Sequence, residues 1–449
     1  MIPETGAQGS KRVTRTYLLI AGLYTLSASL IWGVNTLFLL DAGLTIFEVF
    51  VANAFFTAGM VVFEIPTGVV ADTAGRRVSF LLSLIVLILG TIGYLLLAEA
   101  GAGVIAFSAA SVVLGLGFTF YSGAVEAWVV DALNATGYTG TLDQVFVRGG
   151  MVTGGAMLIG TLGGGVLGSI DLAIPFVARV VFLAAALGVA AFAMHDIGFE
   201  PRRVTIKEYP AEMRRTARVG IRYGWDNRSI RLLLIISLIQ MGVFTWAFYA
   251  WPPLFLELLG SDAVWVAGAV ASGIALSMMI GNALVGWLTK FCGRRTTIML
   301  WAVGISGAAA IVVGVADSFW IAMPALLIST ATIGVMTPVK QSYLNQLIPS
   351  EERATVLSVD SMSGSVGGVV GQVGLGGIAG VASIGVGFVT GAFVSLLALL
   401  PLGALRRHDD TEDLIAGTDG GPNAACAAQG IPEIAAVDTT PRRETADVG

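Results

Sequence analysis

Four charged side chains interrupt or border long apolar stretches of the sequence: Glu64, Glu126, Asp131 and Lys340. A charged group in an apolar medium costs several kcal/mol unless it is paired or hydrated, so such residues are functional candidates by default. Burial also favours the protonated form of a carboxyl group, so Glu64 or Glu126 could exchange a proton. The alternative is that these groups lie at a membrane surface, where they are solvated and structural.

Aromatic and amide side chains form a second group of candidates. Trp32 and Asn35 are three residues apart and therefore share one helical face. Gln240, Trp246 and Tyr249 lie together in a later apolar stretch. Aromatic rings combined with amides suit a moderately large amphipathic organic molecule. The alternative is that they belong to an interfacial aromatic belt or to helix packing.

The sequence lacks the motifs of several other kinds of chemistry. It contains no phosphate-binding G-x-x-x-x-G-K-[ST] loop, no H-E-x-x-H helix and no G-x-S-x-G elbow. The two cysteines are far apart, and both histidines border apolar stretches. There is no basic face suited to nucleic acid. We therefore expect neither an enzyme nor a metal site, a cofactor or a nucleic-acid partner.

The composition is that of an integral membrane protein. Of the 449 residues 55% are hydrophobic and 12% are charged, whereas soluble domains carry about 25% charged residues. A membrane-spanning helix needs about 20 mainly apolar residues. Twelve such spans are predicted, because the last uncharged run is long enough for two. The runs are 16–40, 49–71, 78–98, 100–125, 149–170, 173–194, 232–256, 263–289, 296–316, 318–339 and 361–405.

The loops between these runs alternate in charge. Loops that carry Lys or Arg, such as those at Arg76 and Arg294, alternate with loops that carry only acids. Cytoplasmic loops are enriched in basic residues, so both termini are predicted to be cytoplasmic. The predicted organisation is a cytoplasmic N-terminus (1–15), a six-helix bundle (16–195), a cytoplasmic linker (196–231), a second six-helix bundle (232–405) and a disordered cytoplasmic tail (406–449).

Two loops repeat one another at a separation of 218 residues. The first runs from Gly68 to Arg77 and the second from Gly286 to Arg295, and each ends in Gly-Arg-Arg. Both follow the second span of their half. Such parallel repeats mark one large class of transporter.

The segment from Gly68 to Arg77 resembles the signature loop of the major facilitator superfamily. The resemblance implies an all-α integral membrane fold with twelve transmembrane helices in two pseudo-symmetric six-helix bundles. It also implies that the two loops latch the cytoplasmic gate. Asp72 precedes Arg76 by four residues and could pair with it on a helix. The gating residues are then Gly68, Asp72, Gly75, Arg76, Arg77, Gly286, Lys290, Gly293, Arg294 and Arg295.

The same resemblance assigns roles to the other candidates. The superfamily's central cavity is lined by helices 1, 4, 7 and 10, which makes Trp32, Asn35, Gln240, Trp246 and Tyr249 substrate-binding candidates. The inner ends of helices 4, 5, 10 and 11 close the cytoplasmic mouth, so Lys340 is predicted to pair with Glu126 or Asp131. Two features typical of proton-coupled drug exporters are missing, namely an arginine in the fourth span and a proline in the fifth.

These observations together predict a secondary active transporter in the cell membrane. We expect it to work as a monomer in the lipid bilayer and to export a small amphipathic organic solute by alternating access, driven by protons. Uptake or exchange of a metabolite is the alternative. A membrane sensor that does not transport is more remote, because the gate loops are intact in both halves.

Overall fold

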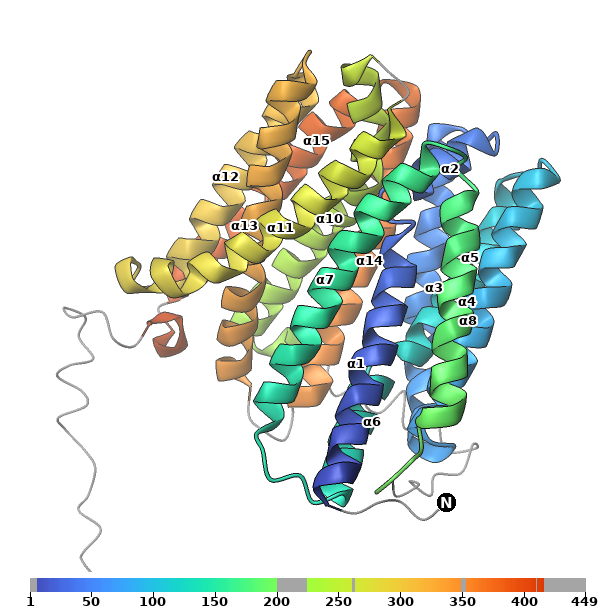
Figure 1. Cartoon of the computed structure of the whole chain (residues 1–449). Coiled ribbons are helices and arrows are strands. Elements are labelled where there is room, and N and C mark those ends of the chain that lie inside the picture. Colours follow the sequence, from blue (N-terminus) through green and yellow to red (C-terminus); the bar gives the residue numbers. More distant parts are fainter. Residues whose placement is uncertain (1–5, 200–223, 261–262, 349–352, 409, 416–449) are drawn as a thin grey trace, which may run out of the picture.

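The computed structural model describes residues 6–199, 224–260, 263–348, 353–408 and 410–415 (Figure 1). Within these ranges the regular structure is helical apart from one isolated bridge between Arg294 and Leu414. Eleven helices are long and apolar enough to cross a membrane. The remaining predicted crossing, 16–40, is divided between two helices. With that pair counted as one crossing, the twelve expected crossings are present.

The first half contains eight helices that make six crossings. They are α1 (Ala7–Ser29), α2 (Asn35–Asp41), α3 (Ile46–Thr73), α4 (Arg76–Glu99), α5 (Val104–Tyr121), α6 (Ala124–Ala135), α7 (Leu142–Gly168) and α8 (Ile174–Ala193). The α1–α2 break lies where Gly33 packs on the backbone of Ala267. The α5–α6 break lies at Gly123, whose φ of 73° is left-handed and favours glycine.

The second half repeats this plan. Its helices are α10 (Arg228–Leu259), α11 (Val264–Phe291), α12 (Arg295–Val315), α13 (Phe319–Leu347), α14 (Arg353–Val381), α15 (Ile384–Leu396) and α16 (Leu399–His408), followed by a short 3₁₀ turn η1 (Thr411–Asp413). The Asn227 side chain starts α10 by accepting from the backbone N–H groups of Ser229 and Ile230. Residues 406–408 and 410–415, which belong to the segment predicted to be a disordered tail, are within the described part of the chain.

Helix packing inside the two halves follows one pattern. The contact of α1 with α7 corresponds to that of α10 with α14, and the contact of α3 with α5 corresponds to that of α11 with α13. In the same way α4 packs on α5 and α8, as α12 packs on α13 and α15. This confirms the prediction of two pseudo-symmetric bundles.

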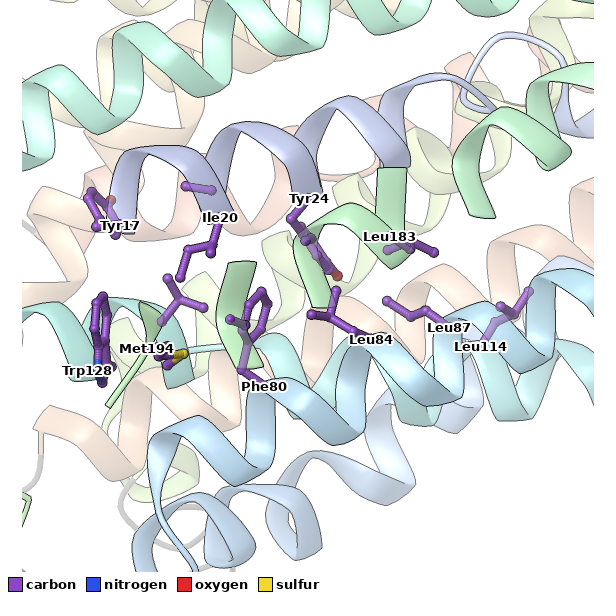
Figure 2. Packing of buried hydrophobic residues seen from close by; sticks show 14 of the residues in the cluster. Tyr17, Ile20, Tyr24, Phe80, Leu84, Leu87, Leu114, Trp128, Leu183 and Met194 are labelled. Atoms are coloured by element: carbon purple, nitrogen blue, oxygen red, sulfur yellow. The ribbon is translucent and has the colours of Figure 1, made fainter. Parts of the chain in front are cut away.

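The core of the first half is aromatic and aliphatic. Ile20 and Tyr24 extend from α1 toward Phe80 and Leu84 of α4 (Figure 2), whereas the Tyr17 ring meets Phe146 of α7 edge-on. The Tyr24 and Tyr121 rings stack with centroids 3.6 Å apart. These contacts hold the first half together as one body.

The two halves meet where α7 crosses α11 and where α3 crosses α14. At the first crossing the Thr161 and Ser272 hydroxyls lie 2.6 Å apart, and Gly165 lies on the backbone of Gly268. At the second, Gln372 Nε2 donates to Thr57 Oγ1 over 3.2 Å. All these contacts lie in the middle of the molecule or toward the end that carries α2, at the top of Figure 1. We call this end the far end.

The opposite end carries both Gly-Arg-Arg turns, and we call it the arginine end. Among the residues that the structure describes, no hydrogen bond or ion pair joins the two halves there. A Cβ atom added at Gly68 or at its repeat partner Gly286 would meet no atom within 4 Å. The molecule is therefore closed at the far end and open at the arginine end.

The glycine crossing supplies a first test. In Gly268→Leu the new side chain would collide with the Thr161 carbonyl and the Gly165 backbone, neither of which yields easily. Overpacking of this kind costs about 1–3 kcal/mol, which corresponds to roughly tenfold in a conformational equilibrium. We expect a cysteine at Ser272 to react roughly tenfold faster with a membrane-impermeant maleimide.

Gly188→Leu is the matched control, because a Cβ at Gly188 meets nothing within 4 Å. Equal reactivity of the Ser272→Cys reporter in both variants would show that the crossing does not hold the far end closed.

Candidate functional site

A cavity of about 720 Å³ lies between the halves, a size that suits an organic solute. No Asp, Glu, Lys, Arg or His is among its lining residues. These are Trp32, Met157, Phe244, Thr245, Phe248, Tyr249, Trp251, Ala271, Ile274, Ala275, Met278, Met279, Asn282, Gly334, Thr337, Pro338 and Gln341. The cavity therefore offers apolar contact and neutral hydrogen-bonding groups.

Aromatic rings form one wall of this cavity. Phe248 meets Trp32 edge-on, with ring centroids 6.1 Å apart, and Tyr249 at 5.2 Å. Phe244 lies one helical turn before Phe248, with centroids 6.2 Å apart. The lining also contains Met157, Met278 and Met279, whose flexible side chains can adapt to different shapes. Such a lining suits an amphipathic molecule with a ring or a chain.

The predicted substrate-binding residues divide into three groups. Trp32 and Tyr249 line the cavity. Gln240 and Trp246 instead border a second cavity of about 50 Å³ inside the second half, where Gln240 bonds to Ser395. Asn35 donates to Asn53 over 3.1 Å and does not line either cavity.

Two cavity residues with a clear sequence signal were not among the predicted ones. Phe244 and Phe248 lie four residues apart, so they share one helical face. Met241 and Thr245 are their neighbours on the helix surface, three residues before Phe244 and three before Phe248. The same periodicity that selected Trp32 and Asn35 would have selected them. Their position in the aromatic wall makes them stronger binding candidates than Gln240 or Trp246.

In the first half, the Gly-Arg-Arg turn forms a charged cluster. Arg76 Nη1 donates to Asp72 Oδ1 over 2.6 Å, which is the pair expected from their spacing. The Arg76 Nε atom lies 3.9 Å from Asp131 Oδ2. Arg76 also lies over the ring of Phe199, 5.8 Å from its centroid. The turn thus connects α3, α6 and the segment after α8.

Asp196, which follows α8, caps the N-terminus of α4. Its Oδ1 accepts from the backbone N–H of Arg77 over 2.9 Å, while Arg77 Nη2 donates to the Ala191 carbonyl over 2.8 Å. Gly75 has φ 113°, and a Cβ there would collide with the Asp196 carboxylate. Burial raises the pKa of Asp196, and the bond from Arg77 opposes that shift.

The second half has an equivalent cap. Asp413 accepts from the backbone N–H and from the hydroxyl of Thr296, both over 2.7 Å. Arg295 Nη1 donates to the carbonyls of Glu412 and Leu414 over 2.5 and 2.6 Å. In each half, therefore, an acid beyond the sixth crossing fixes the start of the third. Asp196 and Asp413 were not among the predicted site residues, although each occupies the same place in its half.

The other second-half gate candidates lie beside this cap. Arg294 Nη1 lies 4.0 Å from Asp413 Oδ2, and the Gly293 carbonyl accepts from the Ile415 N–H over 3.0 Å. Lys290, the counterpart of Asp72, is exposed. The sign of its charge is reversed, so the pair formed by Asp72 and Arg76 has no direct copy here.

The remaining ionisable candidates do not meet one another. Glu64 and Glu126 are exposed on α3 and α6. Lys340 Nζ donates to Asp360 Oδ2 over 2.7 Å, within its own half, rather than to Glu126 or Asp131. The halves are apart at this end, so a pair between them would need the closed arrangement and stays a prediction.

The comparisons with known proteins agree with this architecture. Residues 266–430 match the model of the Major Facilitator Superfamily. A D-xylose transporter from Levilactobacillus brevis is 29% identical over 110 residues, which make up 24% of this chain and 23% of that transporter. The match thus spans about a quarter of the length of this curated relative.

Several solved structures share the fold over nearly the whole chain. The nucleoside transporter NupG superimposes with a TM-score of 0.71 at 11% identity, over 88% of this chain and 99% of the other. A POT family transporter in complex with 5-aminolevulinic acid gives 0.70 at 13% identity, over 91% and 99%. The human organic anion transporter MFSD10 gives 0.56 at 18% identity, over 88% and 99%.

The match of residues 266–430 to the Major Facilitator Superfamily model and the fold shared over nearly the whole chain both support a major facilitator superfamily transporter. Its apolar helices are those of a multi-pass membrane protein.

The paired caps supply a second test. Asp413 is only 1% exposed, and Asp413→Ala would leave the Thr296 N–H and hydroxyl without an acceptor. Losing a cap costs about 1 kcal/mol, and unpaired buried groups cost about 1–3 kcal/mol more. We expect the melting temperature of the purified protein to fall by several degrees.

Asp196→Ala should cause a smaller drop, since Asp196 is only partly buried. Asp317→Ala is the control, because this acid is exposed at a loop. Equal melting temperatures for all three variants would show that neither cap stabilises the fold.

Proposed function

We propose that this transporter exports small, uncharged or weakly charged amphipathic organic compounds across the cell membrane by alternating access, using protons as the driving ion. The observation that carries the proposal is the large aromatic and methionine-rich cavity without a charged lining residue. A charged solute would find no counter-charge there, whereas an apolar ring gains contact area and neutral partners.

The direction of transport rests on the orientation of the molecule. The arginine end is assigned to the cytoplasm because of its basic loops, so the open cavity faces the cytoplasm and can receive a solute from inside. Both termini would then be cytoplasmic. Residues 1–5, 200–223 and 416–449, which belong to the proposed N-terminus, linker and tail, lie outside the described part of the chain.

The Gly-Arg-Arg turns would act as the cytoplasmic gate. Gly68 and Gly286 face open space here and leave room for the opposite half to approach. Glu126 or Asp131 would pair with Lys340 on closure, and Glu64 or Glu126 could carry the proton. Each half contains one turn, so a single chain supplies the whole gate and would work as a monomer.

Uptake or exchange of a metabolite is the second candidate. It is favoured by the names of the similar proteins, which include a D-xylose transporter and a nucleoside transporter. The neutral hydroxyl and amide groups of the cavity, such as Asn282 and Gln341, would serve a sugar or nucleoside.

A growth screen separates the two candidates. Cells that overexpress the protein are compared with empty-vector cells on a panel of toxic amphipathic compounds, with and without an uncoupler. Export predicts resistance to several neutral aromatic compounds, which the uncoupler abolishes. Increased sensitivity to toxic sugar or nucleoside analogues would favour uptake, and no change on any compound would count against export.

The aromatic wall supplies a third test. Phe248→Ala removes the ring that contacts Trp32 and Tyr249. Such a ring contributes about 1.5–3 kcal/mol of burial, so we expect KM for an exported compound to rise at least about tenfold. Uptake into inverted vesicles would measure it.

Phe192→Ala is the matched control, because this ring is 82% exposed on α8 and touches neither cavity. An unchanged KM in Phe248→Ala would exclude this wall from the binding site.

A further inference from the structure

An ion pair is buried between α10, α13 and α14 in the second half. Lys340 Nζ donates to Asp360 Oδ2 over 2.7 Å and to Oδ1 over 3.1 Å. The Ser237 hydroxyl donates to Asp360 Oδ1 and accepts from Lys340 Nζ over 2.5 Å. Asp360 is only 8% exposed. The three residues come from three helices, each about two turns inside the arginine end.

Few other groups influence this carboxylate. The neighbour from α10 is the neutral Ser237, and the neighbour from α13 is Lys340. α3 packs along α14 through Thr57 and Phe50, and its membrane-spanning part carries one acid, Glu64, which is exposed. The hydrogen-bonded site itself contains one acid and one base, and adding one proton leaves it with a net positive charge.

The ion pair shares a helical turn with the transport cavity. Gly334, Thr337, Pro338 and Gln341 of α13 line that cavity, and Lys340 lies between the last two on a different face. Pro338 has no N–H, so the backbone bond to Gly334 is missing and the helix is weakened at this turn. A change in the Lys340 contacts can therefore move residues that touch the solute.

We propose that Asp360 is the group that binds the coupling proton, with Lys340 as its counter-charge and Ser237 as the hydroxyl that orients it. The proposal deepens the proposed function and rests on it. It places the binding of the coupling proton in the second half, whereas Glu64 and Glu126 are the candidates for that role in the first half. A proton from water in the open cavity binds an Asp360 carboxylate oxygen. Lys340 stays protonated, and its ammonium group loses its anionic partner.

The consequence is a change in the preferred conformation. An unpaired buried ammonium group is costly, so Lys340 gains by turning toward the water-filled cavity past the weakened turn at Pro338. Proton binding at Asp360 thereby changes the cavity wall and the balance between open and closed arginine ends. Solute and proton act on opposite faces of the same turn.

The test follows the conformation of the substrate-free protein, with the proton as the ligand. Nitroxide labels are placed on cysteines at Gln144 and Phe291, exposed positions at the arginine ends of α7 and α11, after Cys292 and Cys426 are replaced by serine. Electron–electron distances are measured in lipid nanodiscs between about pH 5 and 8. We expect the distance distribution to change with pH, and Asp360→Asn to abolish that change.

Glu99→Gln and Asp317→Asn are the matched controls, because both acids are exposed and lie outside the ion pair and the gate. Both should keep the full pH response. Should Asp360→Asn not fold, Ser237→Ala keeps both charges and removes one donor to the carboxylate. It should alter the pH response of the distance distribution, because the carboxylate loses a hydrogen-bond donor. A pH response that is absent in the unmodified protein, or unchanged in Asp360→Asn or Ser237→Ala, would overturn the proposal.

The readout needs no solute, so it separates two kinds of failure. Resistance in the growth screen without a pH-dependent distance would leave export standing and remove Asp360 from the coupling. A pH response that requires Asp360, without solute movement in the screen, would contradict the proposed function instead.

Discussion

The close crossing of α7 over α11 is the contact on which the arrangement of the two halves depends. Gly165 and Gly268 let the helix backbones touch, and the hydroxyl pair of Thr161 and Ser272 satisfies two polar groups in the same place. Apolar side chains gain little by leaving lipid for a protein surface, so helix association in a membrane relies on such close packing and on hydrogen bonds. With this crossing formed, the halves can separate only at the other end, and the cavity opens there.

The charged side chains of this architecture lie outside the lining of the large cavity. The cavity wall is neutral, whereas the charges lie in the turns at the arginine end and in the pair of Lys340 and Asp360. A neutral wall tolerates solutes of different shapes, because no fixed charge demands one orientation. The charged groups lie where the proposed gate requires the helices to move relative to one another. The turn of α13 that contains Pro338 brings the two together, because Lys340 of the ion pair and Gln341 of the cavity lining are consecutive residues.

Much of the fold could be predicted from local sequence patterns. The length of the apolar runs defines the crossings, and the repeated Gly-Arg-Arg turn defines the two halves. The spacing of Asp72 and Arg76 predicted their contact, because side chains four residues apart on a helix lie next to each other. The same local rules cannot pair residues on different helices. Lys340 finds Asp360 on the next helix along the chain, a choice that depends on how α13 and α14 pack.

The site was predicted less completely than the fold for a similar reason. Trp246 and Tyr249 are three residues apart, yet one lies in the interior of the second half and the other in the transport cavity. The tilt and rotation of α10 decide this, and the sequence does not encode them locally. The caps formed by Asp196 and Asp413 depend on segments that return to a helix start more than 100 residues earlier along the chain.

The most direct measurement is transport with the far end locked. Thr161→Cys and Ser272→Cys, combined in one chain without Cys292 and Cys426, place two thiols where the native hydroxyls lie 2.6 Å apart. After oxidation to the disulfide, alternating access predicts that export of a compound found in the growth screen stops and returns on reduction. Undiminished export by the fully cross-linked protein would contradict the account.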